Sequence, residues 1–170
     1  MTRHASVTLA ASSRGFFESG GNSGARVEQG SDGDRAPSIG GKKMDNKLIN
    51  APDAPQPLSS YSQAFEISGH KRLLFVSGQI PVSREGHVPS DFPSQCRLAW
   101  RNLTAQLHAA GMSIENLVKV TTFLADRQYG LVNREIRQEF LGNLRPAATV
   151  IVAGIFDQEW LLEVEAIAAA

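Results

Sequence analysis

Apolar residues follow a strand-like pattern near the C-terminal end of the chain. Two runs rich in Val, Ile, Leu and Ala, within residues 147–168, flank a loop at 154–159. Such runs predict two sheet strands joined by a turn. Glu163 and Glu165 lie two residues apart in the second run, so the pleat places both carboxylates on one face. Two interpretations stay open: a functional site, because a carboxylate in a sheet needs donors, a cation or water, or an edge strand with a solvated face.

The same kind of pattern predicts three strands earlier in the chain. Residues 61–68 and 73–77 read as two strands with Gly69 and His70 as the turn between them, and residues 117–124 read as a third. Gly78, at the end of the second strand, suggests a bulge or a place where a ligand approaches the backbone. The alternative for Gly78 is a simple strand exit.

Apolar residues with a helical period predict two helices. The first is capped by Ser90 or Asp91 and ends at Gly111, and the second ends at Gly142. The first apolar stripe is Cys96, Ala99, Leu103, Leu107 and Ala110, and the second is Tyr129, Val132, Ile136 and Phe140. We expect Cys96 to be a packed small hydrophobe rather than a reactive thiol. Arg134, Arg137 and Gln138 are expected on the solvated side of the second helix.

The order of these elements indicates the fold class. Helices that interrupt the strands, without strict alternation, favour an α+β layer in which both helices pack on one face of a single sheet. The other face of the sheet needs cover that a chain of this length does not supply. We therefore expect oligomerisation through the sheet.

The N-terminal segment differs in composition from the rest of the chain. Residues 1–43 hold more than half of the fifteen glycines, many serines and no apolar periodicity, which predicts disorder. We accordingly assign residues 1–49 to a Gly/Ser-rich extension and residues 50–170 to one folded domain. Met44 is a natural first residue for the folded part. The preceding segment is then either a genuine extension or the product of a start codon placed too early.

Composition and motifs exclude several function classes. Seventeen basic and seventeen acidic residues give zero net charge, so we expect neither a nucleic-acid nor a membrane partner. A single cysteine, Cys96, excludes an intrachain disulfide and fits the cytoplasm. Phosphate-binding loops and metalloprotease motifs are absent, and the four histidines have no metal-ligand spacing, so we expect no metal and no cofactor. Candidates for acid/base chemistry remain: Glu163, Glu165, Tyr61, Ser77, Thr149 and Asn133.

Several segments of residues 51–168 together resemble a known family. These segments are APQPLSSYSQA, LFVSGQIPVSREGHVPSDFPSQCRLAWRNL, AAGMSIENLVKVTTFLAD, RPAATVIVAG and LLEVEAIA. In this order and spacing they resemble the RidA/YjgF family of imine and enamine deaminases. The resemblance implies a chorismate-mutase-like fold, a homotrimer around a central barrel of sheets, and intersubunit clefts that hold small 2-imino or 2-keto acids.

The resemblance also implies roles for individual residues. The glutamate that positions the attacking water matches Glu163. Residues expected to bind substrate match Tyr61, Ser77, Gly78, Asn133, Ala148 and Val150. At the position of Ala148 the family's deaminases carry an arginine that holds the substrate carboxylate, so we expect little of the family's standard activity on 2-imino acids. We expect Ala148→Arg to restore it, because residue 148 would lie opposite Glu163 on the paired strand.

Without an arginine at position 148, another cation would have to hold the substrate carboxylate, or the protein would have another function. Arg145 is expected to point away from the site, whereas Arg127 or Arg134 of a neighbouring subunit is a possible replacement. One hypothesis is a diverged member of the deaminase family that hydrolyses a C=N bond. The alternative is a non-catalytic, metabolite-binding or regulatory member. Ribonuclease activity is disfavoured by the zero net charge and the absence of a basic patch with interleaved aromatic residues.

Overall fold

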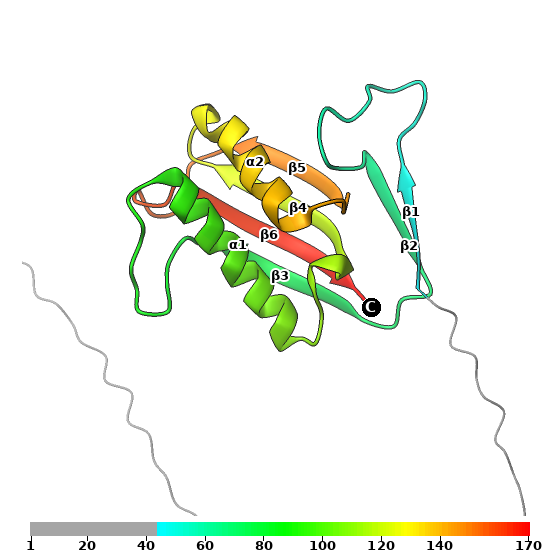
Figure 1. Cartoon of the computed structure of the whole chain (residues 1–170), viewed down its shortest axis with the longest axis horizontal. Helices are drawn as coiled ribbons and strands as arrows, with labels where there is room; N and C mark the ends of the chain where they lie inside the picture. Colours follow the sequence, from blue (N-terminus) through cyan, green and yellow to red (C-terminus); the bar gives the residue numbers. More distant parts are fainter. Residues whose placement is uncertain (1–43) are drawn as a thin grey trace, which may run out of the picture. The chain divides into compact units, whose positions relative to one another are not determined.

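A computed structural model describes residues 44–170 as two sheets and two helices (Figure 1). Strands β1 and β2 pair antiparallel in a two-stranded sheet. The other strands form a four-stranded mixed sheet in the order β3-β6-β4-β5, in which β4 and β5 are parallel and the remaining pairs are antiparallel. The strands are β1 Asp45–Ile49, β2 Ala64–Ser68, β3 Leu73–Gln79, β4 Leu117–Leu124, β5 Ala147–Val152 and β6 Leu162–Ala169.

Both helices lie on one face of the four-stranded sheet, which confirms the expected α+β class (Figure 1). Helix α1 spans Phe92–Ala109 and α2 spans Gly130–Leu141, with short 3-10 turns at Ile114–Asn116 and Arg127–Tyr129. Asp91 is the N-cap of α1, and its Oδ1 accepts a hydrogen bond from the Ser94 backbone N–H at 2.8 Å. Within the described residues, no helix is long and apolar enough to cross a membrane.

The core lies between α1 and the central strands. Alternate residues of β6 are buried beneath the helices, namely Leu162, Val164, Ala166 and Ala168. Cys96, Trp100 and Leu103 of α1 belong to the same buried cluster. Cys96 is therefore a packed core residue, as expected, and burial raises the pKa of its thiol to about 12.

Strand pairing differs from the sequence-based prediction in three places. The last two strands are not neighbours, because β4 lies between β5 and β6. Strand β6 is central, so the interpretation of Glu163 and Glu165 on an edge strand is wrong. Strand β2 pairs with β1 rather than with β3. Strand β1 lies upstream of the boundary at residue 50, while residues 1–43, where disorder was predicted, lie outside the described residues.

Gly78 does belong to a bulge, as the sequence suggested. Val76 pairs with Ala166 and Gln79 with Val164, so two residues of β3 stand against one residue of β6. The bulge interrupts β3 next to Glu163. It is the feature that brings the backbone of Gly78 against that carboxylate.

Candidate functional site

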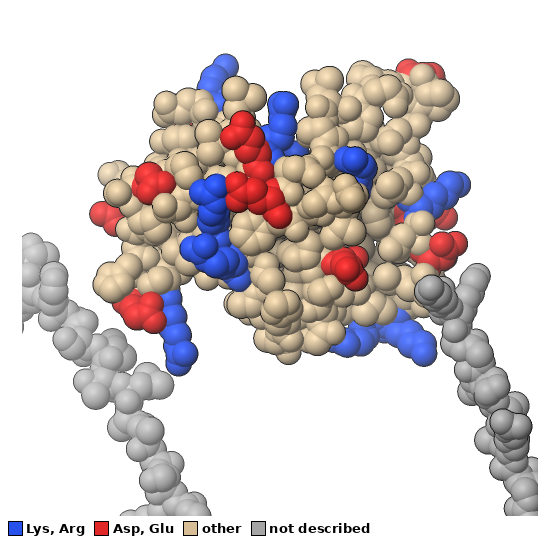
Figure 2. Space-filling view, viewed as in Figure 1, with Lys and Arg blue, Asp and Glu red and all other residues tan. Residues whose placement is uncertain are grey.

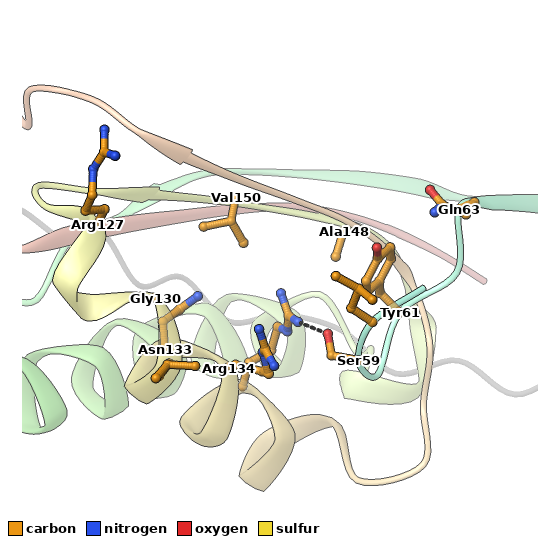
Figure 3. Close-up of a pocket in the computed structure, with 12 residues that line it drawn as sticks. Ser59, Tyr61, Gln63, Arg127, Gly130, Asn133, Arg134, Ala148 and Val150 are labelled. Atoms are coloured by element: carbon orange, nitrogen blue, oxygen red, sulfur yellow. Dashed lines mark hydrogen bonds between the residues drawn. The ribbon is translucent and has the colours of Figure 1, made fainter. Parts of the chain in front are cut away.

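A cleft of about 570 Å³ lies between helix α2, strand β5 and the segment that precedes β2 (Figure 3). We call it the α2–β5 cleft. Four residues predicted to bind substrate line it: Tyr61, Asn133, Ala148 and Val150. The remaining lining residues are Leu58, Ser59, Gln63, Arg127, Gly130, Leu131, Arg134 and Arg137.

The sheet register directs two of these side chains into the cleft. Ala148 pairs with Val120, and Val150 pairs with Thr122. Val120 and Thr122 are each only 1% exposed, and Val120 belongs to the core beneath the helices. Paired residues of neighbouring strands point to the same face, so Ala148 and Val150 face the helix layer. They form the strand wall of the cleft.

Tyr61 is held at the cleft by the segment that precedes β2. The Ser62 hydroxyl donates a hydrogen bond to the Arg145 carbonyl at 2.9 Å, and Ser62 forms a bridge with Ala147. These contacts tie the segment to the start of β5, next to Ala148. On the opposite wall, Asn133 is 1% exposed on α2, and its Oδ1 accepts from the Cys96 thiol at 3.9 Å.

Three arginines give the cleft a positive charge, and none of its twelve lining residues is acidic. Arg127 lies at the end of the cleft away from Ser59 and Tyr61, and Arg134 lies near its middle (Figure 3). Arg137 is only 5% exposed, and its Nη2 donates to the Ser59 hydroxyl at 3.1 Å. Burial, followed by the nearby charge of Arg134, lowers the pKa of the Arg137 guanidinium.

The burial of Arg137 contradicts the prediction that it is solvated. The buried face of α2 is Asn133, Ile136, Arg137 and Leu141, displaced by one residue from the predicted stripe. Asn133 and Arg137 are four residues apart and therefore share a helix face. That spacing is present in the sequence, but two polar residues do not predict a buried helix face. Arg145, as expected, is exposed and does not line the cleft.

Ser77, Gly78 and Glu163 form a second group outside the cleft. A Cβ atom added to Gly78 would lie 1.5 Å from Glu163 Oε1 and 2.5 Å from its Cδ. Only glycine at this position leaves room for the carboxylate where it stands. Glu163 is half-buried, whereas Ser77 and Glu165 are exposed.

The two groups lie on opposite faces of the sheet in one chain. Glu163 pairs with Phe123 of β4, an odd number of residues from Val120, with which Ala148 pairs. Because side chains alternate along a strand, Glu163 points away from the helices and Ala148 points toward them. The expectation that residue 148 lies opposite Glu163 on a paired strand is therefore wrong. Residue 148 is also two strands away, since β4 separates β5 from β6.

Comparison with known proteins identifies relatives across the folded part. The family model described as Endoribonuclease L-PSP matches residues 51–170. A RutC family protein of Pyrococcus horikoshii is 34% identical, covering 72% of this chain and 96% of the relative. The putative reactive intermediate deaminase TdcF of Escherichia coli is 30% identical, covering 72% and 95% respectively.

Solved structures give the same result. The crystal structure of E. coli TdcF with bound serine has a TM-score of 0.56 and 30% identity, covering 73% of this chain and 98% of that one. A putative endoribonuclease of Thermotoga maritima has the same TM-score and 29% identity, covering 73% and 97%. On the evidence of the matched family model, these relatives and the shared fold, the chain belongs to the RidA/YjgF family, also described as Endoribonuclease L-PSP.

Proposed function

We propose that the protein binds a small 2-imino or 2-keto acid in clefts between copies of the chain and hydrolyses a C=N bond there. The supporting observation is the division of the seven candidate residues into two groups on opposite faces. One copy would supply Tyr61, Asn133 and the strand wall. A second copy would supply Ser77, Gly78 and Glu163.

The helix-free face of the sheet supports assembly through that face. Leu73 and Phe75 of β3 are 47% and 71% exposed, and Ile151 of β5 is 44% exposed. Exposed apolar side chains on the helix-free face, at both edges of the sheet, favour contact with another protein surface. We propose a homotrimer with a central barrel of sheets. Light scattering that finds a stable monomer would contradict both the trimer and an intersubunit site.

In the proposed reaction, the Glu163 carboxylate orients a water molecule toward the imine carbon. The water oxygen bonds to that carbon, the C=N bond is lost, and ammonia leaves as the keto acid forms. The name of TdcF as a putative reactive intermediate deaminase and its structure with serine support a small-molecule ligand of this size.

The departure at Ala148 changes what we expect the site to accept. The strand wall offers no cation there, and the guanidinium groups come instead from the α2 side of the cleft. An acid held from the α2 side would place its imine carbon differently, relative to Glu163, from an acid held by an arginine at position 148. We therefore propose that simple monocarboxylic 2-imino acids are poor substrates.

A coupled assay tests this proposal. An amino-acid oxidase generates a 2-imino acid, and its decay is followed with and without the protein. We expect little acceleration for imines of simple aliphatic amino acids and a gain for Ala148→Arg, which would add a guanidinium beside Tyr61. Fast turnover of those imines by the unmodified protein would contradict the proposed change in ligand.

The alternative function is metabolite binding without turnover, which the missing cation at Ala148 favours. Binding of a keto acid together with inactivity toward every imine would support it. Ribonuclease activity, which the family description names, has less support. Basic and acidic residues are interspersed on the face that carries the helices (Figure 2), and the net charge is zero. Loss of RNA cleavage on further purification would exclude it.

The state of the single cysteine bears on the cellular compartment of the protein. A lone buried thiol fits a reducing compartment, so we propose the cytoplasm. Imaging of a fluorescent fusion would test this.

A further inference from the structure

Arg137 is a buried cation without a buried counter-ion. Among residues 44–170 the one salt bridge joins Arg97 to Glu139, so Arg127, Arg134 and Arg137 all lack an acidic partner there. Exposed arginines need none, because water solvates them. Arg137 is different, because the residue is only 5% exposed and the desolvation of its charge is costly unless an anion compensates it.

The unused donors of Arg137 open into the α2–β5 cleft. Within residues 44–170 this side chain makes one hydrogen bond, from Nη2 to the Ser59 hydroxyl. The sealed side-chain polar atoms that lack a partner in the described part of the chain are Trp100 Nε1 and Thr122 Oγ1, and no Arg137 nitrogen is among them. The other guanidinium nitrogens are therefore reachable from the cleft that Arg137 lines.

The charge of the cleft exceeds what one carboxylate neutralises. Arg134 lies close enough to Arg137 for its charge to act on it, and Arg127 lies toward the other end (Figure 3). Glu163 from a second copy would supply one negative charge. Three guanidinium groups against one carboxylate leave the cleft with a net positive charge, which favours an anionic ligand over a neutral one.

We infer that Arg137 is the residue that holds the ligand's carboxylate in this protein and that Arg134 pairs with a second acidic group. The ligand class is then a dicarboxylic 2-imino or 2-keto acid. This inference rests on the proposed function for the identity of the cleft as the ligand site. Its structural basis is the burial of Arg137, the free hydrogen-bond donors of Arg137 and the positive charge of the cleft. A planar guanidinium suits this role because it binds a carboxylate through two parallel hydrogen bonds.

Calorimetric titration of the full-length protein tests the inference with two probes that differ in charge. 2-Oxoglutarate carries two carboxylates and 2-oxobutyrate carries one. We expect 2-oxoglutarate to bind more tightly, and Arg137→Gln to weaken it by about thirty-fold or more, because one partner of a buried charged pair is lost. We expect Arg134→Gln to abolish the preference for 2-oxoglutarate over 2-oxobutyrate.

Matched variants separate these effects from general ones. Arg101 is exposed on α1 and does not line the cleft, so Arg101→Gln removes the same charge and should leave both affinities unchanged. If Arg137→Gln does not fold, Arg137→Lys retains the charge while losing the two-pronged geometry, and should weaken 2-oxoglutarate binding. Equal affinity of the unmodified protein for the two probes, or no binding of either, overturns the inference. So does full affinity in a folded Arg137 variant.

Failure of the inference is distinguishable from failure of the proposed reaction. Binding of 2-oxoglutarate through Arg137 without hydrolysis of any imine supports the inference and contradicts the reaction. Hydrolysis of imines without a preference for a second carboxylate supports the reaction and contradicts the inference. Glu163→Gln provides the cross-check, because it should lower hydrolysis and leave the order of the two affinities unchanged.

Discussion

Substitution of Gly78 by alanine tests whether imine hydrolysis depends on the position of the Glu163 carboxylate. The added Cβ would lie 1.5 Å from Oε1, whereas ordinary contact begins near 3.4 Å, so the carboxylate has to withdraw by roughly 2 Å. The three nearest atoms all belong to the Glu163 side chain, which can rotate away. We therefore expect the fold to survive with its carboxylate displaced.

The expected effect on activity is large relative to the size of the change. A misplacement of about 1 Å in a catalytic group can lower a rate on the order of a hundredfold, so Gly78→Ala should lose at least that much imine hydrolysis. The assay is the oxidase-coupled decay of an imine that the unmodified protein hydrolyses, with thermal unfolding as the check of structure. Gly154→Ala is the matched control, because its added Cβ meets nothing within 4 Å. An unchanged rate in a folded Gly78→Ala variant would refute the assigned role of Glu163.

Three further predictions concern the scaffold. Phe75→Glu places a charge on the exposed sheet face and should convert the proposed homotrimer to a monomer in light scattering, while circular dichroism stays unchanged. Asp91→Ala removes the N-cap of α1 and should lower the free energy of unfolding by about 1 kcal/mol in urea titrations, with no loss if the cap contributes nothing. Burial raises the pKa of Cys96 to about 12, so the native thiol should resist aromatic disulfide reagents at pH 8. The free energy of unfolding should also fall as pH rises above about 8.5, where only the unfolded thiol ionises.

The sequence predicted correctly those elements whose local hydrophobic pattern matches their burial in the fold. Strand 117–124 has the predicted bounds, and Asp91 is one of the two predicted caps of α1. Strand β1 was missed because Asp45–Ile49 is polar and largely exposed, so hydrophobic alternation is weak there. Strand neighbours were also missed, because periodicity reports which face of a strand is buried and carries no information about its partner.

For the candidate site, too, the sequence identified residues but not their arrangement in the sheet. The resemblance identified Tyr61, Asn133, Ala148 and Val150, which line the cleft, whereas the contact between Gly78 and Glu163 was not predicted. Their separation onto two faces depends on the placement of β4 between β5 and β6, which is a property of the whole sheet. Arg137 was predicted to be exposed because arginine is rarely buried, whereas the structure buries it.

The central place of β6 has a consequence for synthesis of the chain. Residues 162–169 are made after the other strands of this sheet, yet they pair with both β3 and β4. Until they leave the ribosome, β3 has no partner in its sheet, and one edge of β4 stays open. Unpaired strand edges favour association with other chains, so the nascent protein is exposed to aggregation until β6 has been made. Loss of these eight residues would leave β3 unpaired and separated from the β4–β5 pair instead of leaving a shortened sheet, so it should abolish folding.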